Sequence, residues 1–362
     1  MSNTSHPISL LKQEWTTTIR NEAASAEKQG KLTKKQLNLI HEQDWFKLLA
    51  PSSIGGKQYS LPDAMELMEA LACADGSLGW VVTLCSGASW FTGFMNPETA
   101  KAIMSSDKAC IAGSGDNSGT AELKGGKYTI NGKWAYASGA GEATAFTVNC
   151  KVVEGGKTTG TISVVLMKDE VTVNDDWNGM GMAATNSCSF EVKGVTVGED
   201  RIFRINDNPT APNAIYAYPF LQLAEATLAA NLCGMAYHFM DLCKTVIEEK
   251  DESTSEARDY KDSLIDSYNT LSKKLHNQRQ KLYYAVDMSW QLCSANKNVS
   301  QSVLYKVTSA AAVSVTVIRD CVNFLYPHCG MSAGNKSSEI NRVFRDINTA
   351  GLHSLLAGNG IL

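Results

Sequence analysis

The chain has 362 residues, of which 44% are hydrophobic and 19% are charged, a balance typical of a folded protein with a sizeable apolar core. With 33 basic and 37 acidic residues the net charge is only -4, and no basic run offers a surface for nucleic acid. The N-terminal residues MSNTSHPISLLKQEW lack a basic end followed by an unbroken apolar stretch, so we expect no signal peptide and a cytoplasmic location.

Neither a membrane span nor a cysteine framework is predicted. Residues 221–243 are the most apolar helical stretch, but they include Glu225, Asn231, His238 and Asp241, which favours a buried helix. The 10 cysteines are scattered without a C-x-x-C pair, so the spacing predicts no zinc site and no disulfides. Small buried thiols in a reducing compartment are the expectation.

Residues 1–107 have the pattern of a helical domain. Apolar side chains recur at helical spacing over residues 34–49 and again over residues 63–74. The stretch between them, APSSIGGKQYSLP, contains the glycine and proline residues that favour a turn.

Residues 108–205 change to the alternation typical of strands. In KYTINGKW, Asn131 and Gly132 separate two alternating runs, and Asn-Gly suits a two-residue hairpin turn. A second hairpin is predicted where AFTVNCKVV and TISVVLM flank EGGKTTG, and FEVKGVTV is a further strand. This part predicts a small antiparallel, barrel-like β domain.

Residues 206–362 return to long helices, predicted at 214–250, 257–295, 299–326 and 338–356. Four long helices joined by short polar turns predict an antiparallel four-helix bundle. The fold class is therefore α+β, with an N-terminal helical domain, a central β domain and a C-terminal four-helix bundle.

Two kinds of glycine motif suggest other functions. Glycines at residues 113–115 and 179–181 lack the strand, turn and helix of a dinucleotide site. The piece GMSAG fits the G-x-S-x-G pattern of hydrolases, with Ser332 at its centre and Asp346 and His353 in the usual later order. The sequence before it is helical, where an esterase needs a strand, so both alternatives are disfavoured.

The last predicted helix carries a polar stripe. At helical spacing Arg342, Arg345, Thr349 and His353 share one face, opposite an apolar face. The stripe is either a solvated face or the border of an anionic or polar ligand, with arginine for negative charge and histidine for proton handling. The local pattern leaves both interpretations open.

Several motifs in chain order resemble the acyl-CoA dehydrogenase superfamily. They are LAPSSIGGKQYSL, AGSGDNSGTAELKGGKYTINGKWAYASG, NGMGMAATNS, VKGVTVGEDRIF and GMSAGNKSSEINRVFRD. The resemblance covers nearly the whole chain and implies the same order of helical domain (1–107), β domain (108–205) and four-helix bundle (206–362).

The resemblance also implies a flavin cofactor, FAD or FMN, held between the β domain and the last helices. Trp134 would pack against the flavin, and Ser138 and the strand backbone from Tyr136 would face its pyrimidine ring or N5. Arg345 would reach the cofactor or hold the final helix in place. The other implied cofactor contacts are Ser114, Thr185, Ser187 and Gly334.

The same resemblance separates two chemistries. Acyl-CoA dehydrogenases need a carboxylate base, commonly about nine residues after the arginine of R-D, but here that position is Ser354, preceded by His353. Glu225 is a possible substitute. A second branch of the superfamily uses reduced flavin and oxygen to hydroxylate small, often aromatic molecules and often has histidine near this place, so we predict that His353 is catalytic and faces the flavin.

The main prediction is therefore a flavin-dependent monooxygenase of the acyl-CoA dehydrogenase fold. The alternatives are an acyl-CoA dehydrogenase with bound FAD and a non-catalytic flavin-binding or structural homologue. A monooxygenase of this kind would need a separate flavin reductase and a small-molecule substrate, and the resemblance implies a homotetramer or homodimer.

Overall fold

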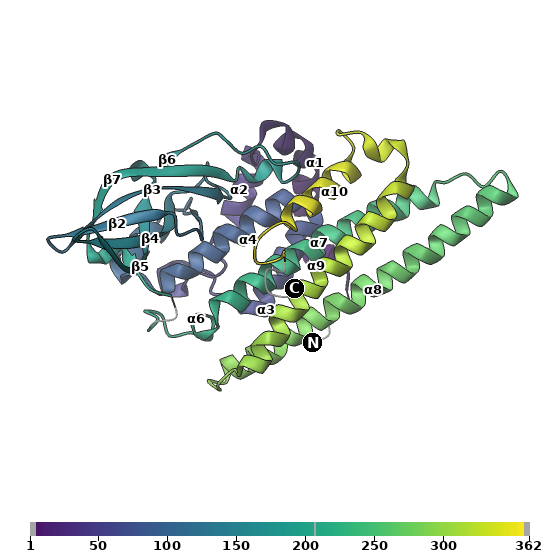
Figure 1. Cartoon of the computed structure of the whole chain (residues 1–362). Coiled ribbons are helices and arrows are strands. Elements are labelled where there is room, and N and C mark those ends of the chain that lie inside the picture. The colour runs from purple at the N-terminus through teal and green to yellow at the C-terminus, as the bar shows by residue number, and fades with distance from the viewer. Residues whose placement is uncertain (1–4, 206–207, 358–362) are drawn as a thin grey trace.

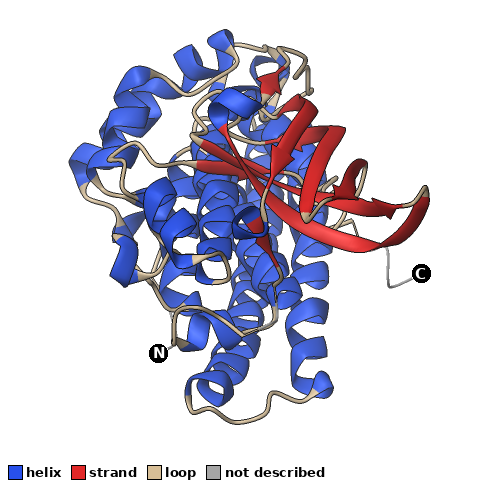
Figure 2. Cartoon of the chain, turned by 90° about the vertical axis from the view of Figure 1, so that its left-hand side faces the viewer, coloured by secondary structure: helices blue, strands red, loops and turns tan. Residues whose placement is uncertain are grey.

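A β-sheet lies at one end of a body of helices in the computed structural model, which describes residues 5–205 and 208–357 (Figure 1). The sheet lies on one side of the helices when the chain is turned (Figure 2). The N-terminal helices are α1 (Gln13–Gln29), α2 (Lys34–Glu42), α3 (Leu61–Ala74), α4 (Gly76–Trp90) and α5 (Pro97–Met104). The order of helices, strands and helices agrees with the predicted fold class.

Local capping explains where these helices begin. Thr33 and Gln36 form a capping box at α2, in which each side chain accepts a hydrogen bond from the other residue's backbone N–H. The carboxylate of Asp75 accepts from Leu78 N at 2.9 Å, so one residue ends α3 and begins α4. The chain therefore turns sharply between two helices that are buried nearly all round.

The sheet has eight strands in the order β6-β7-β3-β2-β4-β5-β8, with β1 paired to β4. Most neighbours are antiparallel, but β4 runs parallel to both β1 and β2, so the sheet is mixed where an antiparallel one was predicted. The strands are β1 (Ile111–Gly113), β2 (Gly119–Lys124), β3 (Lys127–Ala137), β4 (Ala145–Glu154), β5 (Lys157–Met167), β6 (Thr172–Val173), β7 (Cys188–Val197) and β8 (Ile202–Phe203).

One predicted turn is wrong. Asn131 and Gly132 lie inside β3, and the chain instead turns at Gly125 and Gly126, which have φ values of +57° and +76°. Positive φ at both central residues is what a two-residue hairpin requires, and two glycines provide it without strain. Asn131 instead sits at a register shift in the β3–β7 ladder, where its side chain accepts from Gly194 N. The second predicted hairpin, between β4 and β5, is present with its turn at residues 155 and 156.

Four long C-terminal helices follow, as predicted. They are α7 (Phe220–Glu248), α8 (Ser255–Ser294), α9 (Gln301–Leu325) and α10 (Glu339–Ala350), preceded by the short α6 (Ala214–Ala217). The last helix ends six residues earlier than expected. The carbonyl of Gly351, just past its end, accepts a hydrogen bond from Arg319 Nη2 of α9 at 2.5 Å, which satisfies the helix terminus from a neighbouring helix.

The N-terminal and C-terminal helices share one hydrophobic core, and the sheet has a second core of its own. Helix α3 packs against α7 closely enough that a Cβ at Gly234 would lie 2.1 Å from Glu69 O. Glu69 of α3 also forms a buried ion pair with Arg279 of α8, with Oε1 2.6 Å from Nε. The domain division at residues 107 and 205 stays a prediction, and the second boundary adjoins residues 206–207, which lie outside the described residues.

By length and apolar composition, the segment Gln301–Cys329 could cross a membrane. The helix within it, α9, packs against α7 and α8 in the bundle. Core helices of soluble proteins can have the same length and composition. The packing therefore favours a bundle helix, in keeping with the expectation of no membrane span.

Candidate functional site

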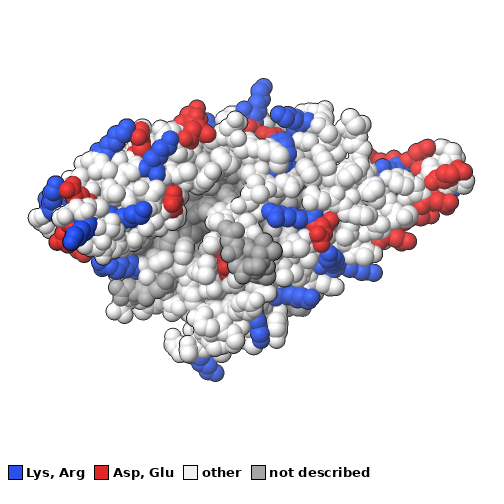
Figure 3. Space-filling model, in the orientation of Figure 1, with Lys and Arg blue, Asp and Glu red and all other residues white. Residues whose placement is uncertain are grey.

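A cavity of about 240 Å³ lies where α4, α7, the sheet and the segment after α10 meet. Figure 3 shows the surface hollowed at this junction, between the β domain and the helical body. Its walls are mostly apolar, with aromatic side chains from Phe91, Phe203 and Phe220. Hydroxyl and amide groups interrupt them, from Thr83, Ser114, Ser138, Thr147, Asn149, Ser163 and Thr227. An apolar cavity with a few polar groups is the usual form of a small-molecule site.

Two glycines keep the cavity open. Gly87 lies within α4 and Gly115 follows β1, and both line the cavity. A Cβ added to either would have no neighbouring atom within 4 Å. The space beside these backbones is therefore available to a planar ligand.

Three of the predicted residues form a chain of buried hydroxyl groups. Ser138 Oγ lies 2.8 Å from Ser187 Oγ, which lies 2.6 Å from Thr185 Oγ1. Thr185 donates to the carbonyl of Met182 at 2.8 Å, so each hydroxyl before it must donate along the chain towards Thr185. Ser138 also accepts from Trp80 Nε1 at 3.2 Å. The Ser138 hydroxyl hydrogen is therefore used in the bond to Ser187, and the lone pair that remains is an acceptor at the cavity wall.

His353 lines the same cavity, but not from a helix. Helix α10 ends at Ala350, and His353 lies in the turn that follows, with its ring 5.8 Å from the Trp80 ring. Burial lowers the pKa of the imidazole, which favours the neutral ring. Leu355 N donates to Nδ1 at 3.3 Å, so in the neutral ring the proton resides on Nε2. The site therefore holds a neutral N–H donor near an oxygen acceptor.

The other residues of the predicted polar stripe do not line the cavity, and Arg342 lies 3.5 Å from Glu339 on the same helix. Arg345 is paired with Glu27 of α1 at 2.5 Å and donates to Met180 O at 3.0 Å. Thr349 Oγ1 accepts from Gly181 N at 2.9 Å. Of the two predicted roles for Arg345, the structure supports the one that holds the final helix in place.

Of the eight predicted cofactor contacts, the described cavity walls include Ser114 and Ser138 but not Trp134, Tyr136, Thr185, Ser187, Gly334 or Arg345. Trp134 is fully buried in the core of the sheet, stacked on Phe190 with ring centroids 5.5 Å apart. Tyr136 is 75% exposed at a positive φ of 62°, and Gly334 is exposed in the connection before α10. Trp134 is in phase with the buried Tyr128 and Ile130, and the register shift that follows it turns Ala137 inward as well. Trp134 supports the site indirectly, because its Nε1 donates to the carbonyl of Asn149 at 3.1 Å.

Sequence reasoning missed several wall residues, including Thr83 and Asn149. Thr83 accepts from Asn231 Nδ2 at 3.1 Å, while the Oδ1 of that asparagine is buried and makes no hydrogen bond. Asn149 accepts from Ser163 and donates to the carbonyl of Gly115 at 3.1 Å. A threonine in a helix and an asparagine in a strand carry no local signal of function, so only the three-dimensional contacts reveal them.

Among the described residues that line this cavity there is no aspartate or glutamate. Glu225, the predicted substitute base, lies on α7 with its carboxylate accepting from Thr308 Oγ1 of α9 at 2.5 Å. Burial raises its pKa. Its partner on α9 shows that the side chain points into the bundle and not into the cavity.

The hydrolase alternative fails on geometry. Ser332 donates to the carbonyl of Cys329, Asp346 accepts from Met182 N, and His353 contacts Trp80. These three residues have separate partners and form no triad. The parallel strand pairs, β1 with β4 and β2 with β4, lack the βαβ crossover helix of a dinucleotide-binding fold.

Residues 226–357 match the family described as "Acyl-CoA dehydrogenase, C-terminal domain". "Flavin-dependent monooxygenase, oxygenase subunit HsaA" of Rhodococcus jostii (strain RHA1) is 26% identical over 233 residues, 62% of this chain and 61% of that protein. The chain thus spans about three fifths of the length of that relative.

Solved structures share the fold over almost the entire chain. The 3-HSA hydroxylase from Rhodococcus sp. RHA1 has a TM-score of 0.87 at 20% identity and covers 98% of this chain and 94% of its own. XiaF from Streptomyces sp., a structure in complex with FADH2 and glycerol, has a TM-score of 0.87 at 18% identity, with 98% and 92% covered.

Proposed function

From the family match of its C-terminal residues, its similarity to flavin-dependent monooxygenases and its shared fold, we propose that this chain is the oxygenase component of a two-component flavin-dependent monooxygenase of the acyl-CoA dehydrogenase superfamily. It would use reduced flavin and O2 to hydroxylate a small aromatic molecule. The observation that carries the proposal is the cavity itself, whose walls include both the His353 imidazole and the Ser138 hydroxyl and have no carboxylate among their described residues.

The cavity fits a flavin ring in shape and in hydrogen bonding. Open space lies beside Gly87 and Gly115, and apolar side chains form the opposite wall. Ser138 presents an acceptor, which suits the N–H that a flavin ring gains on reduction. A bound reduced flavin would supply the electrons that activate oxygen.

The Ser138 acceptor would hold the ring. Its direction is fixed by Ser187 and Thr185. The Met182 carbonyl fixes the direction of all three hydroxyl groups. The Ser138 acceptor therefore needs little reorientation when a donor binds. The three phenylalanines at the wall would exclude water from the reacting atoms and pack against an aromatic substrate.

His353 would donate a hydrogen bond from its Nε2–H to an oxygen in the cavity. Burial disfavours the imidazolium form, so the ring would act as a neutral hydrogen-bond donor. The single turn after α10 fixes the ring, since Leu356 N and Ala357 N both donate to the His353 carbonyl.

The dehydrogenase alternative requires a base that the described walls lack. Removal of a weakly acidic C–H proton next to a thioester needs a carboxylate beside the substrate. Glu225 is engaged by Thr308 and points into the bundle, so the described walls of the cavity offer no carboxylate for this step.

We also infer that the partners include a separate flavin reductase and a second copy of this chain, with FAD or FMN as the transferred cofactor. The groove between α8 and α9 has a volume of about 410 Å³ and is lined by exposed Tyr284, Met288, Tyr305 and Val313. An apolar surface of this kind on a helical bundle suits a homodimer or homotetramer contact. The buried free cysteines fit a cytoplasmic location.

Anaerobic titration with reduced and oxidised FAD and FMN tests the proposal. Tighter binding of a reduced flavin, followed by hydroxylation of a phenol or indole when oxygen is admitted, is the expected result. Tight retention of oxidised FAD that an acyl-CoA bleaches would support the dehydrogenase, and no binding in either redox state would support a non-catalytic homologue. Either of the last two results would overturn the proposal.

A further inference from the structure

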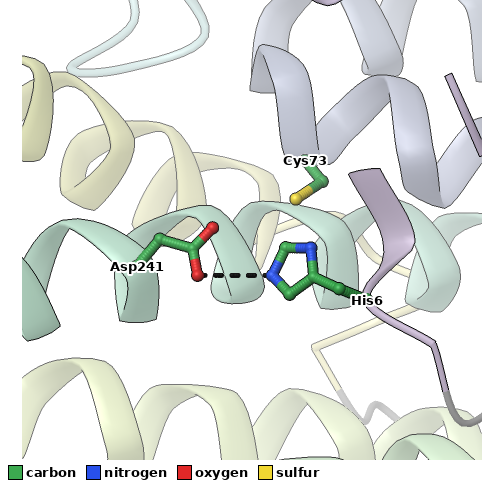
Figure 4. Close-up of side chains that lie close together, drawn as sticks. All are labelled: His6, Cys73 and Asp241. Carbon is green, nitrogen blue, oxygen red and sulfur yellow. Dashed lines mark ion pairs between the residues drawn. The ribbon is translucent and has the colours of Figure 1, made fainter. Parts of the chain in front are cut away.

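Three potential metal ligands converge outside the cavity, on the face where the N-terminal segment meets the helices. His6 precedes the short helical turn Pro7–Leu10, Cys73 lies near the end of α3, and Asp241 lies on α7 (Figure 4). One ligand atom from each lies within 4.8 Å of the others. We propose that His6, Cys73 and Asp241 form a binding site for a divalent metal of the zinc type.

The two ring nitrogens of His6 lack a hydrogen-bond partner. Both nitrogens are shielded from water. Nε2 lies 3.3 Å from Asp241 Oδ1, yet the two groups do not align as a hydrogen bond. A buried imidazole nitrogen without a partner costs free energy, and coordination to a metal ion would remove that cost.

The ligand set suits zinc in chemistry and in charge. Thiolate, imidazole and carboxylate are the three side-chain ligands that Zn²⁺ prefers, at bond lengths of about 2.0 to 2.3 Å. Donors at those lengths in a tetrahedron lie roughly 3.3 to 3.8 Å apart, so the His6–Asp241 separation already fits. The Cys73 sulfur lies within 4.8 Å of the other two ligand atoms. A thiolate and a carboxylate also neutralise the two charges of the ion.

The surroundings allow a metal to enter and to be held. The side chains of His6 and Asp241 are 35% and 46% exposed, whereas Cys73 is buried, so the site opens to solvent on one side. The Tyr237 ring packs edge-on against His6 at 5.2 Å and orients it. With three protein ligands, a water molecule would complete the coordination.

Such an ion would fasten the N-terminal segment to α3 and α7, and so would be structural. None of the three ligands lines the cavity, and the inference does not depend on the proposed function. No motif in the sequence predicts this site, because ligands 67 and 168 residues apart along the chain match no zinc-type spacing.

Titration of the metal-free chain with Co²⁺ tests the site, because cobalt substitutes for zinc and is coloured. We expect one Co²⁺ per chain, with tetrahedral ligand-field bands and a thiolate-to-cobalt charge-transfer band. Cys73→Ser should abolish the charge-transfer band, and His6→Gln should weaken binding by about tenfold or more. Cys293→Ser and His328→Gln, which change residues outside the cluster, should leave both unchanged.

Thermal unfolding with Zn²⁺ provides a readout that is independent of colour. A ligand that binds only the folded state raises the melting temperature, so Zn²⁺ should stabilise the wild type and both controls but not His6→Gln. Circular dichroism of each variant confirms that it is folded. Failure of the wild type to bind Co²⁺ stoichiometrically, or a charge-transfer band that persists in folded Cys73→Ser, would overturn the proposal.

Discussion

Asp346 offers the sharpest test of how the final helix is attached. The residue is only 3% exposed, and its Oδ1 accepts from Met182 N at 2.5 Å. Burial and the nearby Asp75 raise the pKa of its carboxyl from 3.8 to about 7, against the opposing effect of Arg342. Glu27 of α1 raises the pKa further.

The raised pKa makes stability depend on pH with a definite sign. Between about pH 4 and pH 7 the folded state binds a proton at Asp346 that the unfolded chain releases, so stability falls as the pH rises through this window. The shift of about 3 units corresponds to roughly 4 kcal/mol in total, and to about 2.5 kcal/mol between pH 5 and pH 8. Above pH 7 this contribution to the pH dependence disappears.

Asp346→Asn removes the charge and keeps an oxygen that can accept from Met182 N. We expect the unfolding free energy of the variant, relative to wild type, to increase by about 2.5 kcal/mol when both are moved from about pH 5 to about pH 8. Urea denaturation at the two pH values measures this difference. Asp262→Asn, an exposed control on α8, should show no such change. If Asp346→Asn and wild type differ equally at both pH values, the reasoning is refuted.

Three further changes test the cavity and the helical core. His353→Ala should lower product formation by about 10²-fold and release more hydrogen peroxide per reduced flavin, with reduced-flavin affinity changed by only a few fold; a rate equal to wild type would remove His353 from the chemistry. Gly87→Leu should fill the open space beside α4 and weaken reduced-flavin binding by about tenfold or more, measured by anaerobic titration, whereas Gly87→Ala should raise the unfolding free energy by roughly 0.5–1 kcal/mol. Glu69→Gln should cost about 3–5 kcal/mol in urea denaturation because it leaves Arg279 buried without its charge partner, and the double change Glu69→Leu with Arg279→Met should cost less than the sum of the single changes.

The order of helices and strands could be predicted because the two periodicities differ and each persists for many residues. The bounds of α8 and α9 lie within two residues of the predicted 257–295 and 299–326. Turns were harder, since Asn131-Gly132 and Gly125-Gly126 carry equivalent local signals and only the pairing of β2 with β3 distinguishes them.

The site could be predicted only in part, because a motif fixes position along the chain and not direction in space. Ser114, Ser138 and His353 line the cavity, and the roles that the resemblance implied for them stay predictions. Trp134 does not line it, because it lies in phase with Tyr128 and Ile130 on the face of β3 that packs into the core of the sheet. His353 reaches the cavity for a reason that helical spacing could not show, since the helix ends before it and the chain bends.

Polar side chains of α10 connect the Ser138 acceptor and the His353 imidazole, two polar groups of the cavity. Arg345 donates to Met180 O, Thr349 accepts from Gly181 N and Asp346 accepts from Met182 N, so one helix face binds two consecutive peptide groups. The approach is so close that a Cβ at Gly181 would lie 2.2 Å from the backbone of Arg345.

This attachment of α10 to residues 180–182 affects both of these polar groups of the cavity. This loop leads directly to Thr185 and Ser187, which set the direction of the Ser138 hydroxyl. Helix α10 ends one turn before His353 and so determines where the imidazole lies. A shift of α10 against the loop would therefore move the proton donor and the oxygen acceptor relative to each other, which explains why arginine, aspartate and threonine are used there to bind protein backbone and not a ligand.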